Sequence, residues 1–424
     1  MYKESKYTLT YKNDDHYLLF NTYSGSICDI TSEEYEEYRL YINKKHSEND
    51  ILIETLHKLG FLIDEDKDET KILNLMRIRN ALQTQNLFFR IIPSTACNAR
   101  CFYCYEEGIK FDTMDQSIIP SIIQFISNHI KNDTKHVTIQ WYGGEPLLQI
   151  DTIKKITIQL KELFKKRKVN YTFSMISNGI LLNQSMMHII KNELEIKKIQ
   201  ITLDGYGETY NKRKSYIQNM NNPFEKIMKN IDLLEKNHIN VNIRLNCDGT
   251  NFENMKMLIE FLGYKYTKSY YVNVYAYPLY GCYKKSKNKS DSENILDKNA
   301  FLEIVTLLIK NGLLKVPNFK IRKNSCGATH LNSFFILPNG NLVKCMMDTN
   351  DTVGNVFTGV KLNDSYFKWC DFNIPNECLN CKILPLCQGG CRAGHCGLTQ
   401  NKCFVYKDII NELLLLNDDL FINN

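Results

Sequence analysis

The sequence lacks several features that would place it in common functional classes. It has no run of about 18 apolar residues, the length that a membrane-spanning helix needs, and its first ten residues, MYKESKYTLT, lack the apolar core of a signal peptide. It also has no long lysine or arginine block, and 53 basic against 47 acidic residues leave a net charge of only +6. We therefore expect a cytoplasmic protein with neither a membrane nor a nucleic acid as a partner.

Phosphate-binding glycine motifs are absent as well. Neither Gly-x-Gly-x-x-Gly nor Gly-x-x-x-x-Gly-Lys-Ser occurs, which disfavours a nucleotide phosphate as the ligand. Cysteine is abundant but unevenly spread, because residues 1–86 contain only Cys28 whereas nine of the 15 cysteines follow residue 325. A reducing compartment disfavours disulfides, so this crowding indicates metal sites.

Three further cysteines form a compact motif. Cys97, Cys101 and Cys104 have the spacing Cys-x-x-x-Cys-x-x-Cys and directly follow an apolar run at 87–92. Three thiolates this close can hold three irons of a 4Fe-4S cluster and leave the fourth iron without a protein ligand. An open position is typical of a catalytic metal centre. A structural zinc site with a fourth ligand elsewhere is the alternative interpretation.

This spacing, with Tyr103 directly before the last cysteine, resembles the signature of the radical S-adenosylmethionine (SAM) enzymes. The resemblance implies that SAM binds the open iron and that an electron from the cluster cleaves it to a 5′-deoxyadenosyl radical. That radical takes a hydrogen atom from the substrate. A flavodoxin- or ferredoxin-type reductant is the implied source of the electron.

Strand and helix patterns alternate from residue 87 onward. Strands are expected at 87–92, 136–141, 171–176, 198–203, 240–246 and 271–277, with helices between them and a last helix at 299–310. Six such units indicate a parallel sheet with right-handed crossovers. We predict an α/β fold built on a partial (β/α)6 TIM-type barrel, with the active site at the C-terminal ends of the strands.

Polar motifs fall at those strand ends. By the resemblance, Gly143, Gly144 and Glu145 bind the amino group of SAM, and the other candidates bind its ribose or carboxylate: Ser177, Asn178, Asp204, Arg213 and Arg244. An arginine suits a carboxylate because it can donate two parallel hydrogen bonds. A plain turn at Asn178 and a structural ion pair at Arg244 are the alternatives, and Arg213 is slightly preferred for the carboxylate.

The C-terminal cysteines form a second pattern. Thirteen residues separate Cys326 from Gly340, four more precede Cys345, and the series continues with Cys378, Cys381, Cys387, Cys391 and Cys403. This order resembles the SPASM extension of radical SAM enzymes, which holds two auxiliary iron-sulfur clusters. The resemblance implies three 4Fe-4S clusters in all. One auxiliary cluster has the ligands Cys378, Cys381, Cys387 and Cys403, and the other has Cys326, Cys345 and Cys391.

The second auxiliary set has one cysteine fewer than relatives that use four. Either its cluster keeps an open iron or another residue completes it, such as His330 or Cys282. Cys396 competes with Cys403 as the last cysteine of the pattern. A pair of structural zinc sites is the alternative, since four thiolates also suit zinc.

The first 86 residues form a separate unit. Strands are expected at 7–11, 16–20 and 26–30, a helix starts at Thr31, and a second helix at 48–59 ends at Gly60 before a strand at 61–63. This winged-helix-like α+β module resembles leader-recognition domains, which bind a precursor peptide as an extra strand on a sheet edge. A structural extension and a DNA-binding winged helix are the alternatives, and the many acidic residues disfavour DNA.

We therefore expect three domains: a leader-recognition module at 1–86, a radical SAM barrel at 87–312 and a SPASM domain at 313–424. The predicted function is maturation of a ribosomally made precursor peptide, with a thioether, C–C or C–O cross-link as the product. The first alternative is an anaerobic sulfatase-maturating enzyme, in which an Asp directly follows the second SPASM cysteine. Here Met346 follows Cys345, and Asp348 comes two positions later. The second alternative is a zinc-containing binding protein without catalysis.

Overall fold

The computed structural model describes residues 2–43, 49–104, 106, 111–280, 294–315, 319–322 and 326–421. Cys282, one of the candidates to complete the second auxiliary cluster, lies outside these residues. Within the described part, no helix combines the length and the apolar character that crossing a membrane requires.

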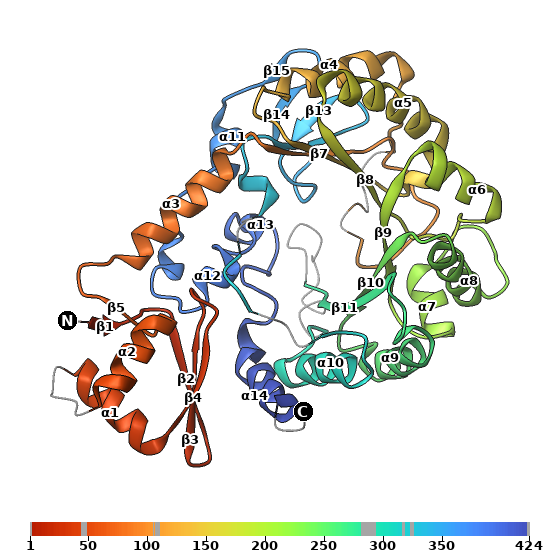
Figure 1. Ribbon diagram of the computed structural model, residues 1–424. Coiled ribbons are helices and arrows are strands. Elements are labelled where there is room, and N and C mark those ends of the chain that lie inside the picture. Colours follow the sequence, from red (N-terminus) through yellow and green to blue (C-terminus); the bar gives the residue numbers. More distant parts are fainter. Residues whose placement is uncertain are drawn as a thin grey trace.

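One ten-stranded sheet organises the molecule, in the order β11-β10-β9-β8-β7-β6-β12-β13-β14-β15 (Figure 1). Its first six strands are parallel neighbours. They are β6 (Asn86–Ile91), β7 (His136–Trp141), β8 (Asn170–Ile176), β9 (Ile196–Leu203), β10 (Asn240–Cys247) and β11 (Val272–Pro278). The six parallel strands and the α/β class predicted from the sequence are confirmed.

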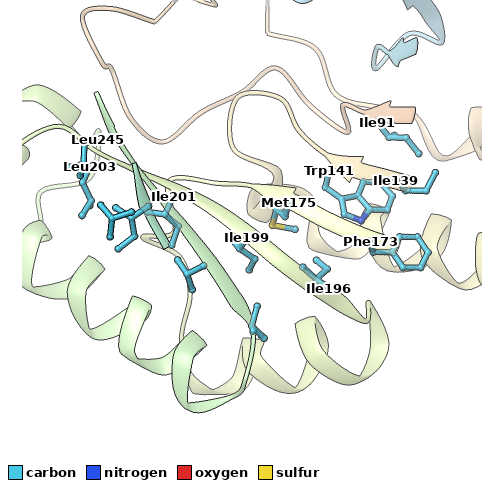
Figure 2. Close-up of a cluster of buried hydrophobic side chains, with 14 of the residues drawn as sticks. Ile91, Ile139, Trp141, Phe173, Met175, Ile196, Ile199, Ile201, Leu203 and Leu245 are labelled. Carbon is cyan, nitrogen blue, oxygen red and sulfur yellow. The ribbon is translucent and has the colours of Figure 1, made fainter. Parts of the chain in front are cut away.

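Helices cover the outer face of these strands (Figure 1). The α-helices are α4 (Ile119–His129), α5 (Ile150–Arg167), α6 (Gln184–His188), α7 (Glu208–Lys214), α8 (Pro223–Lys236), α9 (Phe252–Tyr266) and α10 (Lys298–Lys310). Shorter turns precede or follow three of them: η1 (Gln116–Ile118), η2 (Pro146–Gln149) and the π-helix η3 (Ile189–Glu193). Side chains such as Ile139, Trp141, Phe173 and Ile201 fill the layer between strands and helices, where they are fully buried (Figure 2).

The opposite, inner face of the sheet is polar. Successive side chains of a strand point to opposite faces, and on β9 the fully buried Ile199 and Ile201 alternate with the partly exposed Gln200 and Thr202. On β10, Arg244 alternates with buried apolar residues in the same way. An inner face lined by amides, hydroxyls and a guanidinium is suited to a polar ligand rather than to an apolar core.

The C-terminal part extends the same sheet. β12 (Ser333–Ile336) pairs in parallel with β6, and antiparallel strands follow as β13 (Asn341–Val343), β14 (Thr352–Asn355) and β15 (Gly359–Val360). The remaining elements, apart from the last helix, are short and alternate with the cysteines along the chain. They are η5 (Gly327–Thr329), α11 (Asp364–Trp369), η6 (Asn376–Cys378), α12 (Leu384–Cys387), α13 (Arg392–His395), η7 (Lys407–Ile409) and the longer α14 (Ile410–Phe421). The sheet thus runs across the proposed domain boundary at 312/313, which stays a prediction.

The N-terminal module has two small sheets, one of two strands and one of three, and a core of its own. Its elements are β1 (Tyr2–Glu4), β2 (Thr8–Asn13), β3 (His16–Asn21), β4 (Ile27–Thr31), α1 (Ser32–Ile42), α2 (Asp50–Leu59) and β5 (Leu62–Asp64). Thr31 and Glu34 cap α1 reciprocally, as the sequence suggested. A further helix, α3 (Glu69–Leu82), was not predicted. It packs through Leu73 against Cys378 and Leu384, so it joins the module to the C-terminal cysteines.

Candidate active site

The cysteine loop (residues 97–104) follows β6 and is held by a distant segment. The backbone N–H of Arg100 donates to the carbonyls of Lys214 (3.0 Å) and Ser215 (2.9 Å), and Ile217 donates to the carbonyl of Asn98 (2.9 Å). These bonds fix the loop against the end of α7, which follows β9. The loop therefore lies across the C-terminal ends of the strands, where the sequence placed the active site.

The three thiols of this loop lie close enough to influence one another. Burial raises the pKa of Cys97 to about 12, and nearby negative charge at Glu145, Cys101 and Cys104 adds to the increase. Burial also raises the pKa of Cys101, which Lys214 partly offsets. Three mutually repelling thiolates are stabilised by a cationic group, and iron supplies one. This donor set fits a 4Fe-4S cluster held by three cysteines.

The two glycines after β7 permit close backbone packing. A Cβ atom on Gly143 would lie 2.4 Å from the carbonyl oxygen of Ser94, and one on Gly144 would lie 2.3 Å from that of Ala96. The backbone N–H of Glu145 donates to the Ala96 carbonyl at 2.9 Å. The Gly-Gly-Glu segment therefore lies directly against the residues that lead into the cysteine loop.

Glu145 is fully buried and joins two other predicted residues. Its carboxylate accepts hydrogen bonds from the Ser177 hydroxyl (2.8 Å) and from the backbone N–H groups of Asn178 (2.8 Å) and Leu147 (3.0 Å). Burial raises its pKa to about 7, although these bonds oppose the shift. The Asn178 amide donates in turn to Asn98 Oδ1 at 2.7 Å. The structure thus brings Glu145, Ser177 and Asn178 together beside the cysteine loop.

A second buried network surrounds Tyr103. Its hydroxyl donates to Asp204 Oδ2 at 2.7 Å and accepts from Lys214 Nζ and from Asn246 Nδ2, each at 3.1 Å. Lys214 Nζ also lies 2.9 Å from Asp204 and donates to Thr202 Oγ1 at 2.6 Å. Burial alone would lower the pKa of Lys214, but Asp204 and Tyr103 raise it well above its ordinary value.

Lys214 is the residue of this site that sequence reasoning missed. Its neighbour Arg213 was chosen for the SAM carboxylate, but both terminal nitrogens of Arg213 donate to Asp248, at 2.6 and 3.3 Å, and one also donates to Thr250 (2.8 Å). Its guanidinium carbon also lies 4.7 Å from the centre of the Phe102 ring. Arg213 therefore contacts the cysteine loop through this ring, whereas Lys214, which is only 2% exposed, donates to the Tyr103 hydroxyl.

The C-terminal cysteines separate into two groups. Burial raises the pKa of Cys378 to about 11, and the other cysteines that add to this increase are Cys387, Cys381 and Cys403. In the second group, burial raises the pKa of Cys345 to about 12, and the cysteines that contribute are Cys326 and Cys391. The two groups coincide with the two ligand sets that the SPASM resemblance implied.

The competing ligands have different surroundings. Cys396 is among the groups that raise the pKa of Cys391, so it lies near the second group, whereas Cys403 lies near the first. Burial and Lys344 lower the pKa of His330, and no cysteine contributes to that shift. Among the described residues, no set of three or more histidine, cysteine or acidic side chains is arranged around a single metal ion.

A cavity of about 820 Å³ borders the second cysteine group. It lies between the end of α3, the start of β6 and the turn after Cys326, and Arg79, Arg90 and His330 are among its lining residues. The Arg90 guanidinium is stacked between the rings of Phe88 and Phe335, at 4.2 and 4.6 Å. This cavity opens at the end of β6 opposite to the cysteine loop.

Fold and site together define an α/β enzyme with clustered thiols at the C-terminal edge of a parallel sheet. Residues 91–263 match the family model of the Radical SAM superfamily. The chain is 23% identical to the radical SAM cyclopropyl synthase TigE of Paramaledivibacter caminithermalis, over 98% of this chain and 96% of that relative. This chain therefore contains a radical SAM domain and is a radical SAM enzyme, as its cysteine motif predicted.

Other relatives agree with this assignment. The chain is 24% identical to a cysteine-type anaerobic sulfatase-maturating enzyme of Clostridium perfringens, over 70% of this chain and 86% of the relative. A solved structure of anSMEcpe with bound AdoMet and a peptide aligns with a TM-score of 0.62 at 17% identity, over 79% of this chain and 99% of that chain. SuiB of Streptococcus suis aligns with a TM-score of 0.50 at 16% identity, over 92% and 95%. The solved structures share the fold, and a zinc protein without catalysis is the wrong interpretation.

Proposed function

We propose that this radical SAM enzyme is a SPASM-type maturase that modifies a ribosomally synthesised precursor peptide. The observation that carries the proposal is the similarity to a cyclopropyl synthase along nearly the whole chain, N-terminal module included. A relative whose product is a carbocycle favours the C–C option over a thioether or C–O bond. The name of that relative describes a product only, so the peptide nature of the substrate rests on the module and on the inner face of the sheet.

The N-terminal module supports a peptide partner. Within the described residues, β4 pairs only with β3, so its other edge offers unpaired backbone groups to an added strand. Ile27 on this strand is 42% exposed, whereas Leu9 and Tyr11 on the far strand β2 pack against the main core. The free edge therefore faces away from the barrel and is the candidate leader site.

The residues of the cysteine loop would hold the first cofactor. Cys97, Cys101 and Cys104 fit a 4Fe-4S cluster, which with SAM supplies a 5′-deoxyadenosyl radical that removes a hydrogen atom from the substrate. Glu145 accepts three protein hydrogen bonds, and a carboxylate has about four acceptor sites, so one remains for an ammonium group. Ser177, Asn178 and Asp204 are proposed to orient the rest of SAM.

We assign the carboxylate of SAM to Lys214 in preference to Arg213. Lys214 is buried beside the cysteine loop, and its three N–H donors are directed to Asp204, Tyr103 and Thr202. The carboxylate of SAM would take the place of one of the two neutral acceptors. Both terminal nitrogens of Arg213 are already bonded, to Asp248 and Thr250. A buried ammonium group that already pairs with the carboxylate of Asp204 can also bind the carboxylate of a ligand.

The C-terminal cysteines are proposed to hold two auxiliary 4Fe-4S clusters. Cys378, Cys381, Cys387 and Cys403 would bind one of them, and Cys326, Cys345 and Cys391 the other, which leaves one iron open or completed by a further ligand. Cys378 is buried and packs with Leu384 in an apolar cluster, and such surroundings suit a cluster that exchanges electrons without exchanging ligands. These clusters would accept the electron that is left when the substrate radical closes its new bond. A flavodoxin- or ferredoxin-type protein is the proposed electron donor.

The sulfatase-maturating alternative is supported by the alignment to anSMEcpe but disfavoured by one residue. In the resemblance, the base of that reaction is an Asp directly after the second SPASM cysteine, and here the nearest acid is Asp348. Its carboxylate is only 14% exposed and lies 3.8 Å from Lys368 Nζ. An acid two positions farther along the chain, and already in contact with Lys368, does not occupy the position of that base, which favours the maturase.

The experiment that tests the proposal uses the anaerobically reconstituted enzyme and a short peptide encoded beside its gene. We expect about twelve irons per chain, three clusters of four. We also expect 5′-deoxyadenosine on addition of dithionite and SAM, and a loss of two hydrogen masses from the peptide. Iron with 5′-deoxyadenosine but an unchanged peptide would contradict the proposed substrate. Zinc in place of iron would contradict the proposed clusters.

A further inference from the structure

Arg244 on β10 has no acidic partner among the described residues. Its neighbours in the sheet are Thr202 on β9 and Tyr275 on β11. Its guanidinium carbon lies 4.1 Å from the centre of the Tyr277 ring, and its Nε atom is buried without a hydrogen-bond partner. A buried charged donor without a hydrogen-bond partner is rare in proteins, because the free-energy cost of removing it from water is not recovered. A ligand with an acceptor would remove that cost.

The place of Arg244 on the inner face relates it to the SAM site. Asn246, two residues farther along β10, donates to Tyr103 and Asp204. Residues two apart on a strand share a face and lie about 7 Å apart. The neighbour of Arg244 on β9, Thr202, accepts a hydrogen bond from Lys214. Arg244 thus lies on the same face of the sheet as the residues proposed to hold SAM, two residues earlier on β10.

The other side of Arg244 faces the C-terminal cysteines. The Tyr277 hydroxyl accepts a hydrogen bond from Asn401 Nδ2 at 2.6 Å, which joins β11 to the C-terminal part. Burial raises the pKa of Tyr277, Arg244 opposes this shift, and a negative charge on Cys391 adds to it. Arg244 and Cys391 therefore both lie near the same tyrosine. A substrate held between the SAM layer and the second cysteine group would pass the guanidinium.

We propose that Arg244 binds a carboxylate of the substrate, and this proposal rests on the peptide maturase function. The carboxylate belongs either to an Asp or Glu side chain of the peptide or to its C-terminus. A guanidinium presents a fixed fork of N–H donors that matches a carboxylate, and stacking on Tyr277 fixes the plane of the fork. Arg213 cannot serve this role, because Asp248 already occupies its fork.

The test measures peptide binding without turnover. The reconstituted full-length enzyme with SAM and no reductant is dialysed against three labelled tripeptides: acetyl-Ala-Glu-Ala-amide, acetyl-Ala-Gln-Ala-amide and acetyl-Ala-Ala-Ala with a free carboxylate. We expect one of the two carboxylate peptides to bind roughly tenfold more tightly than the glutamine peptide, the effect of hydrogen bonds to a charged group. Which one does so identifies the source of the carboxylate.

Matched variants assign the preference to Arg244. Arg244→Gln should abolish it, and Arg244→Lys should keep part of it because the charge remains while the fork is lost. Tyr277→Phe should preserve the preference and Tyr277→Leu should weaken it. Arg167→Gln, at the exposed end of α5, is the control for removing one positive charge and should retain the wild-type preference.

Three results would overturn the proposal. They are equal binding of all three peptides by the wild type, an unchanged preference in Arg244→Gln, and a SAM dissociation constant at least tenfold higher in both Arg244 variants, which would assign Arg244 to SAM. Iron content reports whether each variant is assembled. Because dialysis needs no reaction, an enzyme that shows the preference but leaves peptides unmodified would contradict the maturase function and not the carboxylate site.

Discussion

The two cysteine-bearing regions hold similar thiols in different surroundings. Beside the cysteine loop lie the buried charged residues Glu145, Asp204 and Lys214, which come from the ends of separate strands or from the helix after one. Among the C-terminal cysteines, Cys378 packs in an apolar cluster with Leu384. Buried charges are costly unless they are paired. The C-terminal region also buries charges, but Arg77 and Lys344 are both cations that lie near thiols. Charges of both signs beside the cysteine loop are suited to hold a charged small molecule, whereas cations alone are suited to thiolates that store electrons in a cluster.

Removing the thiols of the cysteine loop should abolish the function of one of these two regions and leave the other region intact. We expect the triple variant Cys97→Ala, Cys101→Ala, Cys104→Ala to lose all SAM cleavage, because no cluster would remain to deliver the electron. Iron should fall to about eight per chain, the content of two auxiliary clusters. Chromatographic detection of 5′-deoxyadenosine and an iron assay measure both quantities. Retained cleavage would mean that a different centre activates SAM.

Substituting the adjacent cations Arg213 and Lys214 one at a time should distinguish the residue that binds SAM from the residue that stabilises the fold. Lys214→Gln should weaken SAM binding at least tenfold, because it removes a charge-assisted bond to the ligand. Arg213→Gln should leave SAM affinity within about twofold while lowering the free energy of unfolding by about 3 kcal/mol, since it leaves Asp248 buried and unpaired. Equilibrium dialysis with labelled SAM and urea unfolding measure the two effects. The reverse order of SAM affinities would restore Arg213 as the carboxylate ligand.

Single substitutions of Cys396 and Cys403 should show which of them is the last cysteine ligand of the C-terminal clusters. Cys403→Ala should lower the iron content by about four per chain, because one auxiliary cluster loses a ligand. Cys396→Ala should leave the iron content unchanged, since three thiolates remain for the second cluster. The Lys407 ammonium lies 3.7 Å from Cys403 Sγ, and negative charge on Cys403 raises the pKa of Lys407. Loss of iron from the Cys396 variant alone would make that residue the ligand.

The last prediction concerns the pH dependence of the free energy of unfolding. A glutamate of ordinary pKa, 4.5, releases its proton in the unfolded chain well below the pH at which Glu145, with a pKa of about 7, releases it in the folded protein. The unfolded state therefore binds fewer protons between these values, and the free energy of unfolding falls as pH rises through them, by at most about 3 kcal/mol. Glu145→Gln should flatten this slope in urea unfolding without SAM. An identical slope in the variant would mean that other groups cause it.

Much of the barrel could be read from the sequence. The six parallel strands lie within two residues of their predicted bounds, because each is a short apolar run between polar turns. The cysteine spacing also predicted the radical SAM domain, which the family match confirms. The strands β12 to β15 and the helix α3 were not predicted, since the strands are two to four residues long and α3 lacks a continuous apolar stripe.

The role of Lys214 depends on a feature that the sequence conceals. Arg213 and Lys214 are adjacent, and the end of α7 decides which of them reaches the Tyr103 hydroxyl. Ser215 ends that helix in the left-handed conformation, with φ at 45°, and its carbonyl and that of Lys214 both accept from Arg100. Contacts between residues more than a hundred positions apart thus select the cation, and no local pattern records them.

If the proposed clusters form, the continuous sheet also fixes the distance an electron must travel between them. β6 leads into the cysteine loop, its neighbour β12 follows Cys326, and β13, the next strand, is followed by Cys345. A ladder of backbone hydrogen bonds, rather than a hinged linker, therefore sets the separation between these thiols. Tunnelling rates depend steeply on separation, so a rigid ladder gives every turnover the same transfer rate. Gating would then have to come from the substrate and not from a moving domain.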